Sequence, residues 1–362
     1  MAEMLRPVTV DELVEAVRST PRVLAVGART KSRLSAVPGV ALLSMTGLRG
    51  IIEYEPTEFT FTALAGTPVR EIAAALAEKG QYLPFDPMLA ESGATLGGTV
   101  AAGLNGPGRF RYGGVRDFIL GVRFVDGTGR LLRLGGKVVK NAAGFDLPKF
   151  FTGSLGRFGV LAEITFKVFP RPASRLTLRL PAGDAAGVTG ILTGAAGTRW
   201  DLEALDASLD DNTVQARLAG PEAAIDTLAG EILRRWPGRK LLPDEALEIW
   251  REAAEFSWAH PGGVLVKVAL TPAQLPALAA LGNALAGVRM RVTNGGNTAF
   301  LSLPSPVDAP RLGEGLRTLG TSALTLWGNA PLWPAGRDKP AIASAVKAAL
   351  DPQNRFPSLD ES

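Results

Sequence analysis

The sequence predicts an α+β protein of two domains, and three observations support that prediction. The chain has 362 residues, which is longer than most single domains. Between residues 175 and 328, the order strand, helix, strand, strand, helix occurs twice. In the first half of the chain, strands and helices flank a stretch at 93–108 in which almost every side chain is small.

The composition is that of an ordinary folded protein, and it excludes several kinds of site. Hydrophobic residues make up 46% of the chain and charged residues 20%, which is enough to build a full core. The net charge of +4 is too small to indicate a nucleic acid or an acidic membrane as partner. Because there is no cysteine and only one histidine, His260, the chain cannot form a disulfide, an iron–sulfur site or an imidazole-based metal site.

The first elements are a helix, a strand and a polar loop. Thr9 and Glu12 match a capping box, so a helix is expected at 9–19 with one apolar face. A short apolar strand at 22–26 runs directly into the loop 27–32. Small residues with Thr, Lys and Ser after a buried strand can offer N–H groups, hydroxyls and positive charge to a diphosphate. An ordinary solvated turn is the alternative, since no Walker or G-x-G-x-x-G motif fits here.

Three strands and a helix follow the polar loop. Segments 39–54 and 59–64 have the alternating pattern that predicts strands and turns. The next helix is expected to have Thr67 as its cap and Pro68 at its first position. Gly80 is expected to end it.

The small-residue stretch at 93–108 predicts a wall for a large ligand rather than a part of the core. Glycine and alanine bury little apolar area, but they let a ligand approach the backbone closely. Backbone N–H groups in such turns also form concave sites for anions. We therefore expect an extended cofactor with phosphates to lie here. A glycine-rich surface loop is the alternative, although long loops inside a compact domain are uncommon unless they are functional.

The remaining segments complete both domains. A hairpin is predicted at 116–125 and 130–134 across Asp126-Gly127, and an apolar strand at 160–168 precedes a proline-containing linker. The two βαββα units of the second half predict a mixed sheet with helices on one face. A last helix at 341–350 is followed by a rigid turn at 351–357.

Six short segments, taken together, resemble the FAD-binding domain of the vanillyl-alcohol-oxidase/PCMH superfamily. They are Gly27-Ala28-Arg29-Thr30, Gly93-Ala94-Thr95-Leu96-Gly97-Gly98, Arg116-Asp117, Lys140-Asn141-Ala142-Ala143-Gly144-Phe145-Asp146, Gly153-Ser154-x-Gly156-x-x-Gly159 and Asp351-Pro352-x-Asn354-x-Phe356. Each segment is weak by itself, but their order and spacing cover nearly the whole chain. Within the superfamily, the run at 140–161 most resembles the FAD-binding subunits of glycolate oxidases.

The resemblance implies a PCMH-type FAD-binding domain of two α/β subdomains, plus an α+β cap domain with a mixed or antiparallel sheet. The FAD-binding domain would span 1–172, with subdomains of about 1–65 and 66–172. The cap would span 173–330, and 331–362 would return to the FAD-binding domain. By motif, 27–32 would hold the diphosphate. The expected cofactor-binding residues are Val26, Gly27, Ala28, Arg29, Thr30, Lys31, Ser32, Pro87, Gly93, Ala94, Thr95, Gly97, Gly98, Thr99, Ala102, Arg116, Asp117, Gly153, Ser154, Gly156, Gly159, Val160 and Asn354.

Departures from the family pattern refine the implied function. Many relatives attach FAD through a histidine in the first loop or a cysteine in the second, and this chain has neither, so FAD would be bound non-covalently. Relatives that oxidise 2-hydroxy acids use an arginine, paired histidines and a metal in the cap. With His260 alone that set cannot form, so no metal is expected and no catalytic residue can be assigned.

The resemblance thus implies the FAD-binding subunit of a glycolate or 2-hydroxy acid oxidase or dehydrogenase complex. Its partners would be a larger homologous FAD subunit and an iron–sulfur subunit. No apolar run is long enough to span a bilayer, so we expect a cytoplasmic protein whose membrane association, if any, is made through partners.

Other readings stay open at this point. The chain is either a flavoprotein subunit, a scaffold that keeps the fold without FAD, or a stand-alone FAD-dependent dehydrogenase of unknown substrate. The loop 27–32 and Gly97-Gly98 favour FAD binding. His260 is expected to be structural or solvated rather than catalytic. The arginines near the small-residue stretch either stabilise a reduced flavin or are solvated; they are Arg109, Arg111 and Arg116.

Overall fold

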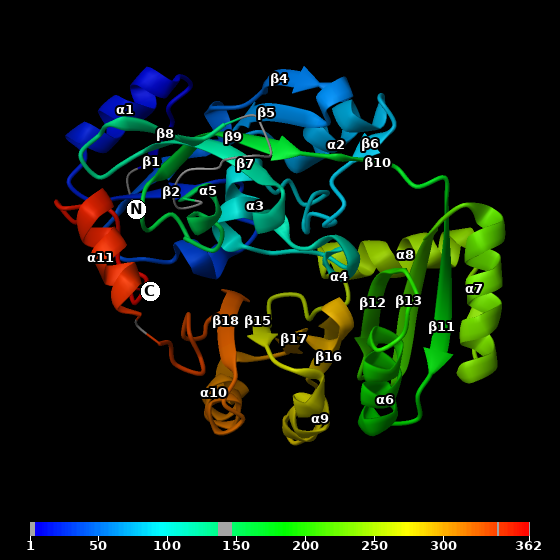
Figure 1. Ribbon diagram of the computed structural model, residues 1–362. Coiled ribbons are helices and arrows are strands. Elements are labelled where there is room, and N and C mark those ends of the chain that lie inside the picture. The colour runs from blue at the N-terminus through cyan, green and yellow to red at the C-terminus, as the bar shows by residue number, and fades with distance from the viewer. Residues whose placement is uncertain (1–3, 137–146, 339, 362) are drawn as a thin grey trace. The chain divides into compact units, whose positions relative to one another are not determined.

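The computed structural model describes residues 4–136, 147–338 and 340–361 (Figure 1). The chain divides into two compact units, and the described strands of the two units share no sheet. The first unit contains Met1–Asn105, Gly114–Arg171 and Asp338–Ser362. The second contains Pro172–Arg337 and the short segment Gly106–Gly113, which the sequence did not single out as part of it.

Two sheets form the first unit. The parallel sheet has the strand order β1-β3-β2. The antiparallel sheet has the order β4-β5-β9-β7-β8. Their strands are β1 (Met4–Leu5), β2 (Val23–Val26), β3 (Ala41–Ser44), β4 (Ile51–Glu55), β5 (Thr60–Leu64), β7 (Ile119–Val125), β8 (Leu131–Gly135) and β9 (Val160–Lys167). A short antiparallel ladder joins β6 (Gln81–Tyr82) to β10 (Phe169–Pro170).

Of the two helix N-caps predicted for the first unit, the structure confirms one and contradicts the other. The helices of this unit include α1 (Val10–Ser19), α2 (Val69–Ala77), α3 (Leu96–Ala102), α5 (Leu147–Phe150) and α11 (Ala341–Leu350). The predicted cap of α1 is confirmed, because the Glu12 N–H donates to Thr9 Oγ1 at 3.1 Å. The predicted cap of α2 is wrong. The Thr67 hydroxyl is buried and instead donates to the Leu64 carbonyl at 2.7 Å and accepts from the Gly50 N–H at 2.9 Å.

The C-terminal segment closes the core of the first unit. Phe356 is 1% exposed and lies in one apolar cluster with Leu13 and Val17 of α1. Asp351 holds the preceding turn, since its carboxylate accepts from the backbone N–H groups of Arg355 and Phe356 at 2.9 Å each. The Val23 N–H of β2 in turn donates to the Arg355 carbonyl at 2.8 Å. This segment therefore stabilises the strand that leads into the polar loop.

The second unit is built on an eight-stranded sheet with the order β14-β11-β13-β12-β16-β17-β15-β18. All of its described pairings are antiparallel. The strands are β11 (Ser174–Pro181), β12 (Leu202–Ser208), β13 (Thr213–Gly220), β14 (Arg239–Lys240), β15 (Val264–Ala269), β16 (Arg289–Thr293), β17 (Thr298–Leu303) and β18 (Ser322–Trp327).

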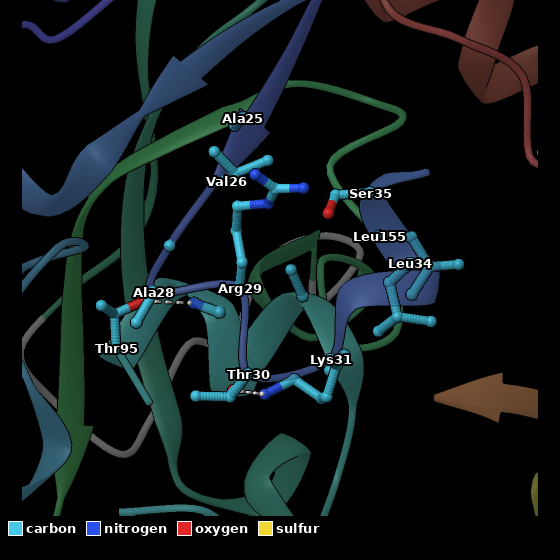
Figure 2. Close-up of a pocket in the computed structure, with 14 residues that line it drawn as sticks. Ala25, Val26, Ala28, Arg29, Thr30, Lys31, Leu34, Ser35, Thr95 and Leu155 are labelled. Carbon is cyan, nitrogen blue, oxygen red and sulfur yellow. Dashed lines mark hydrogen bonds between the residues drawn. The ribbon is translucent and has the colours of Figure 1, made fainter. Parts of the chain in front are cut away.

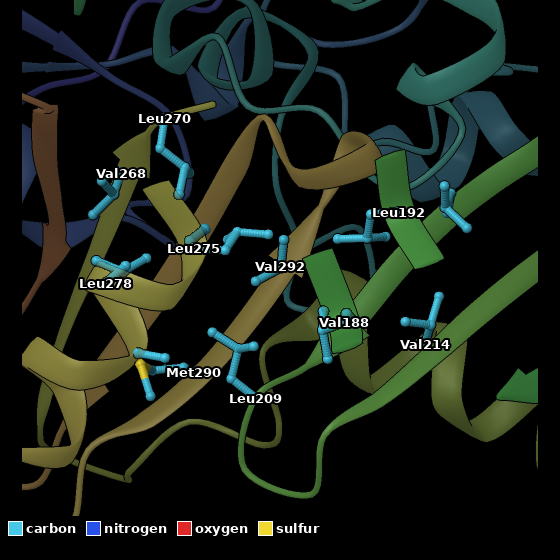
Figure 3. Packing of buried hydrophobic residues seen from close by; sticks show 14 of the residues in the cluster. Val188, Leu192, Leu209, Val214, Val268, Leu270, Leu275, Leu278, Met290 and Val292 are labelled. Atoms are coloured by element: carbon cyan, nitrogen blue, oxygen red, sulfur yellow. The ribbon is translucent and has the colours of Figure 1, made fainter. Parts of the chain in front are cut away.

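One face of this sheet carries a large apolar core. The helices that cover it are α6 (Ala185–Ala196), α7 (Glu222–Arg235), α9 (Leu275–Asn283) and α10 (Ala309–Thr318). Figure 3 shows Val188 and Leu192 of α6 packed together with Val292 of β16 and other members of this cluster. The repeated βαββα order of the sequence is thus explained by helices that return to the same face of the sheet.

The helix α8 (Pro243–Glu255) departs from the predicted arrangement because it contacts the opposite face. The indole of Trp250 donates to Thr177 Oγ1 at 2.9 Å and lies 4.7 Å from the Arg217 guanidinium. Thr177 and Arg217 alternate along β11 and β13 with the core residues Leu178 and Leu218, so they point away from the core. Because the residues on that face are polar, the sequence did not predict that a helix would cover it.

The segment Gly106–Gly113 is fixed to the second unit by a short helix, α4 (Arg109–Tyr112). Phe110 packs against the core of that unit and lies against Gly295, where any side chain would meet its ring. Arg111 forms an ion pair with Asp201 and donates to the Ala219 carbonyl at 3.4 Å. The second unit thus contains Arg109 and Arg111, two of the three arginines that were candidates to stabilise a reduced flavin.

Replacing Phe356 tests the role of the C-terminal segment. We expect Phe356→Ala to lower the free energy of unfolding by about 3–5 kcal/mol, because it leaves a cavity in a closed core. The matched control is Ile342→Ala on α11, whose side chain is 68% exposed and should be nearly neutral. Denaturant titration measures both changes, and equal effects of the two variants would contradict this packing.

Candidate cofactor-binding site

Two adjoining pockets open in the first unit, at the carboxyl end of β2. Their empty volumes are about 490 and 390 Å³, and both values include space open to solvent. The residues that line both pockets are Ala25, Val26, Gly27, Thr95, Gly98 and Ala101. The site is therefore formed where the polar loop after β2 meets the start of α3.

The first pocket is lined mainly by the polar loop (Figure 2). Its further lining residues are Ala28, Arg29, Thr30, Lys31, Leu34, Ser35, Ala102 and Leu155. Arg29 has a φ of 57°, a left-handed conformation that turns the loop sharply. Lys31 is only 8% exposed, and its ammonium donates to Thr30 Oγ1 at 3.0 Å. A lysine charge is thus held against the wall of a small-residue pocket.

The second pocket extends from the same wall toward the antiparallel sheet. Its further lining residues are Met45, Ala65, Gly97, Ser154, Gly156, Gly159 and Leu161. Most of these side chains are small or apolar, and the Ser154 hydroxyl is the exception. This half of the site can accept a flat apolar group, whereas the first half offers positive charge.

The start of α3 is fixed by backbone hydrogen bonds to the segment after β5. The Gly97 N–H donates to the Ala65 carbonyl at 2.8 Å, and the Leu96 N–H donates to the Thr67 carbonyl at 2.9 Å. Thr95 caps the helix, since its Oγ1 accepts from the Gly98 N–H at 3.2 Å. These contacts place the small-residue face of α3 beside the pocket.

Two glycines are required here because a neighbouring segment leaves no room for a side chain at either position. A Cβ on Gly27 would lie 2.2 Å from Thr95 Oγ1, far inside van der Waals contact. A Cβ on Gly97 would lie 2.8 Å from Ala65 Cβ and 3.0 Å from the Ala65 carbonyl oxygen. Either methyl group would move the loop or the helix away from the pocket.

The structure brings many of the sequence-predicted residues together around the pockets. They are Val26, Gly27, Ala28, Arg29, Thr30, Lys31, Thr95, Gly97, Gly98, Ala102, Ser154, Gly156 and Gly159. The predicted residues that do not line these two pockets are Ser32, Pro87, Gly93, Ala94, Thr99, Arg116, Asp117, Gly153, Val160 and Asn354. The predicted segment Lys140–Asp146 lies outside the described residues.

Several of the residues outside the pockets have evident local roles. Asn354 is exposed and has a φ of 52°, and its N–H donates to the Asp351 carbonyl at 3.1 Å in a turn. Asp117 accepts from the Gly114 N–H at 2.8 Å. Gly93 has a φ of 88°, and its nearest neighbour for an added Cβ is Ala28 at 4.0 Å. The buried Thr99 hydroxyl has no hydrogen-bond partner in the described structure.

Sequence reasoning missed part of the lining. The residues it omitted are Ala25, Leu34, Ser35, Met45, Ala65, Ala101, Leu155 and Leu161. Most are alanine or leucine, which occur throughout any core. Only Ala101 carried a signal, because it lies within the small-residue stretch.

These residues fit a dinucleotide cofactor such as FAD. The loop at one end offers backbone N–H groups and the charge of Lys31, which suit a diphosphate. The wall formed by Gly97, Gly98 and Ala101 has almost no side chains, so it leaves room for a flat ring system. The segment Gly153–Gly159 is called the second glycine loop. An added Cβ on Gly153 would meet nothing within 4 Å, so space also remains beside this loop.

The comparison with known families agrees with this fit. Residues 2–135 match the family described as FAD binding domain. The predicted cofactor is therefore confirmed as FAD, and the resemblance stated from the motifs is confirmed as well.

Curated relatives are similar over part of the chain. Glycolate oxidase subunit GlcE of Escherichia coli K12 is 42% identical over 219 residues, which cover 59% of this chain and 61% of that subunit. D-2-hydroxyglutarate dehydrogenase of Xanthomonas citri pv. viticola is 32% identical over 151 residues, 41% of this chain and 32% of that protein. Glycolate oxidase subunit GlcD of Bacillus subtilis is 31% identical over 140 residues, 39% of this chain and 30% of that subunit. The chain thus matches less than two thirds of the length of each.

Solved structures show the same fold over almost the whole chain. An alkyldihydroxyacetonephosphate synthase structure matches with a TM-score of 0.69 and 14% sequence identity, over 98% of this chain and 77% of that one. At this identity the likeness concerns the fold alone. It confirms the predicted fold class, a PCMH-type FAD-binding fold with an α+β second domain.

In the second unit, His260 has structural contacts. Its Nε2 lies 2.7 Å from the Gly287 carbonyl oxygen, and its backbone N–H donates to Ser302 Oγ at 2.8 Å. Among the described residues, no group of His, Cys, Asp or Glu side chains could hold a metal ion. In that same part of the chain, no helix is both long and apolar enough to cross a membrane.

Lys267 is a second-unit residue that the sequence did not single out. It lies on β15 between the core residues Val266 and Val268, so its side chain points to the face opposite the core. Burial, and after it the positive charge of Arg109, lowers the pKa of Lys267 to about 8. An amine of this kind is partly neutral in mildly alkaline solution.

The lowered pKa predicts a pH dependence of stability. An unfolded lysine keeps the ordinary pKa of 10.5, so between about 8 and 10.5 the unfolded chain binds a proton that the folded chain has released. The contribution of Lys267 to the free energy of unfolding should therefore rise with pH in this window. In denaturant titrations, the free energy of unfolding of wild type minus that of Lys267→Met should increase as the pH rises through this range. A constant difference between them would contradict the shift.

Proposed function

We propose that this chain is the FAD-binding subunit of an oxidoreductase complex that oxidises glycolate or a related 2-hydroxy acid. The observation that carries the proposal is the glycine-lined site itself, in which the polar loop after β2 faces the start of α3. The similarity to GlcE over 219 residues supports the substrate class. Other similar proteins are named as D-lactate and D-2-hydroxyglutarate dehydrogenases, which act on the same class of acid.

The residues of the site would hold FAD without a covalent bond. Lys31 and the N–H groups of residues 28–31 would bind the diphosphate, and Arg29 would keep the loop turned. Gly97, Gly98 and the Ser154 hydroxyl would lie along the ribityl chain and the ring system. When bound, FAD supplies the redox chemistry, while the protein supplies position and electrostatics. The chain has no cysteine, and its one histidine belongs to the second unit, so covalent attachment is not proposed.

Oxidation of the hydroxy acid would require a partner subunit. Removing hydrogen from a 2-hydroxy acid needs a base and groups that orient the carboxylate. Among the described residues, His260 is held by the Gly287 carbonyl, and no metal-ligand cluster is present. We therefore place the chemistry of the acid on a larger homologous FAD subunit, with an iron–sulfur subunit as the electron acceptor.

Gly27→Ala tests the site. The added methyl group would lie 2.2 Å from Thr95 Oγ1, so the loop must shift away from α3. We expect the dissociation constant for FAD to rise about tenfold or more, which corresponds to about 1.4 kcal/mol of strain or lost contact. The control is Gly230→Ala on α7, where an added Cβ meets nothing within 4 Å. Titration of apoprotein with FAD, followed by flavin fluorescence, gives both values; unchanged binding by Gly27→Ala would refute the site.

The need for a partner can be tested separately. The purified chain should be yellow and should release FAD on heating, yet it should not reduce a dye with glycolate at the rate of the complex. Co-expression with the larger homologous subunit should restore that activity. Rapid glycolate oxidation by the isolated chain would refute the assignment of the chemistry to a partner, and a colourless chain that binds no FAD would favour a scaffold.

A further inference from the structure

Arg157 is a fully buried arginine with too few partners. It is 0% exposed and lies in the loop that also contributes Ser154 and Gly156 to the second pocket. Its Nη2 donates to the Leu34 carbonyl at 3.2 Å and is 3.5 Å from the Glu361 carbonyl oxygen. Its Nε and Nη1 are buried with no hydrogen-bond partner in the described structure. A buried guanidinium in this state calls for an explanation.

Among the described residues, no buried carboxylate forms an ion pair with the Arg157 guanidinium. Burial lowers its pKa to about 10, with Glu361 opposing and Arg33 adding to that effect, so the group stays cationic at neutral pH. The Glu361 carboxylate forms its ion pair with Arg22, near the surface. Isolated buried charges are costly unless a counter-charge is present. The missing counter-charge is therefore expected to come from a ligand.

Arg157 lies directly behind the wall of the first pocket. The residue that accepts its hydrogen bond, Leu34, lines that pocket, and the Leu34 N–H donates to the Lys31 carbonyl at 3.2 Å. The guanidinium is thus two hydrogen bonds away from the loop residue that carries the lysine charge. Because Arg157 is fully buried, its charge is screened less than the charge of an exposed residue.

The same residue joins three distant segments of the chain. Its backbone N–H donates to the Ser154 carbonyl at 3.0 Å, and its carbonyl accepts from the Lys347 ammonium at 2.8 Å. That ammonium also donates to the Phe356 carbonyl at 2.7 Å. Arg157 therefore links the polar loop, the second glycine loop and the C-terminal segment.

We propose that Arg157 is a positioning residue and a counter-charge for the diphosphate of the bound nucleotide. It would not touch the ligand. It would hold Leu34, and through it the loop 28–31, in the binding conformation, and its unpaired charge would favour a dianionic group in the first pocket. The inference rests on the proposed function, because it assumes that a nucleotide diphosphate occupies this pocket.

The effect of Arg157 on binding of the diphosphate can be separated from its effect on binding of the flavin by using two ligands. ADP carries the diphosphate without a flavin, and riboflavin carries the flavin without phosphate; both are measured as competitors of FAD. Arg157→Met should weaken ADP and FAD about tenfold, the cost of one charge-assisted interaction, and change riboflavin less than about twofold. Arg157→Lys keeps the charge and should restore ADP binding to within about threefold of wild type. An equal loss for ADP and riboflavin in Arg157→Met, with no recovery in Arg157→Lys, would reduce Arg157 to a structural role.

A second variant gives a prediction of opposite sign. Glu361 partly offsets the charge of Arg157, so Glu361→Gln should tighten ADP binding about twofold, as expected for a screened charge near the surface. If Arg157 had only a structural role, Glu361→Gln would bind ADP more weakly than wild type or equally well. The matched control is Glu78→Gln, an exposed residue of the first unit that removes the same charge elsewhere and should have no effect.

The outcomes separate this inference from the proposed function. If wild type binds neither FAD nor ADP, the proposed function fails. If wild type binds both, but Arg157→Met binds ADP equally well and Glu361→Gln binds it no tighter, the inference fails while the proposed function stands. If Arg157→Met does not fold, Arg157→Lys and Glu361→Gln decide, and a Glu361→Gln variant with weaker or unchanged ADP affinity overturns the proposal.

Discussion

The close approach of Gly27 to Thr95 is the constraint on which the rest of the site depends. The loop follows β2 of the parallel sheet, and the start of α3 is bound to the segment after β5 of the antiparallel sheet. The two segments meet with no room for a Cβ at Gly27. The helix α3 is held close to the loop, because the backbone N–H groups of Leu96 and Gly97 form hydrogen bonds with the segment after β5. The two pockets exist because these backbone segments are held together while their side chains remain small.

Charges behind this contact complete the site. Lys31 is almost fully buried at the pocket wall, and two nitrogens of the buried Arg157 guanidinium have no hydrogen-bond partner among the described residues. The C-terminal segment contributes through Lys347 and through the buried carboxylate of Asp351, which fixes the turn before Phe356. Residues far apart in sequence therefore place positive charge at one end of the site, where we propose that the diphosphate binds.

Local patterns predicted much of the fold and part of the site. The cap at Thr9, the small-residue wall and the repeated βαββα order follow from residues close together in the sequence, and the structure contains each of them. Contacts between distant residues were not predictable in the same way. The buried role of Thr67, the placement of α8 against Thr177 and the fixing of Phe110 in the second unit depend on tertiary neighbours. Lining residues such as Ala25 and Leu34 look like any other apolar residues.

A crystal structure of the chain after saturation with FAD tests the central claim most directly. The account predicts the diphosphate against residues 28–31 and the ring system along Gly97, Gly98 and Ser154, with Gly27 still in contact with Thr95. Density for FAD elsewhere on the chain, or a closed groove filled by the protein's own side chains in crystals that contain FAD, would contradict it.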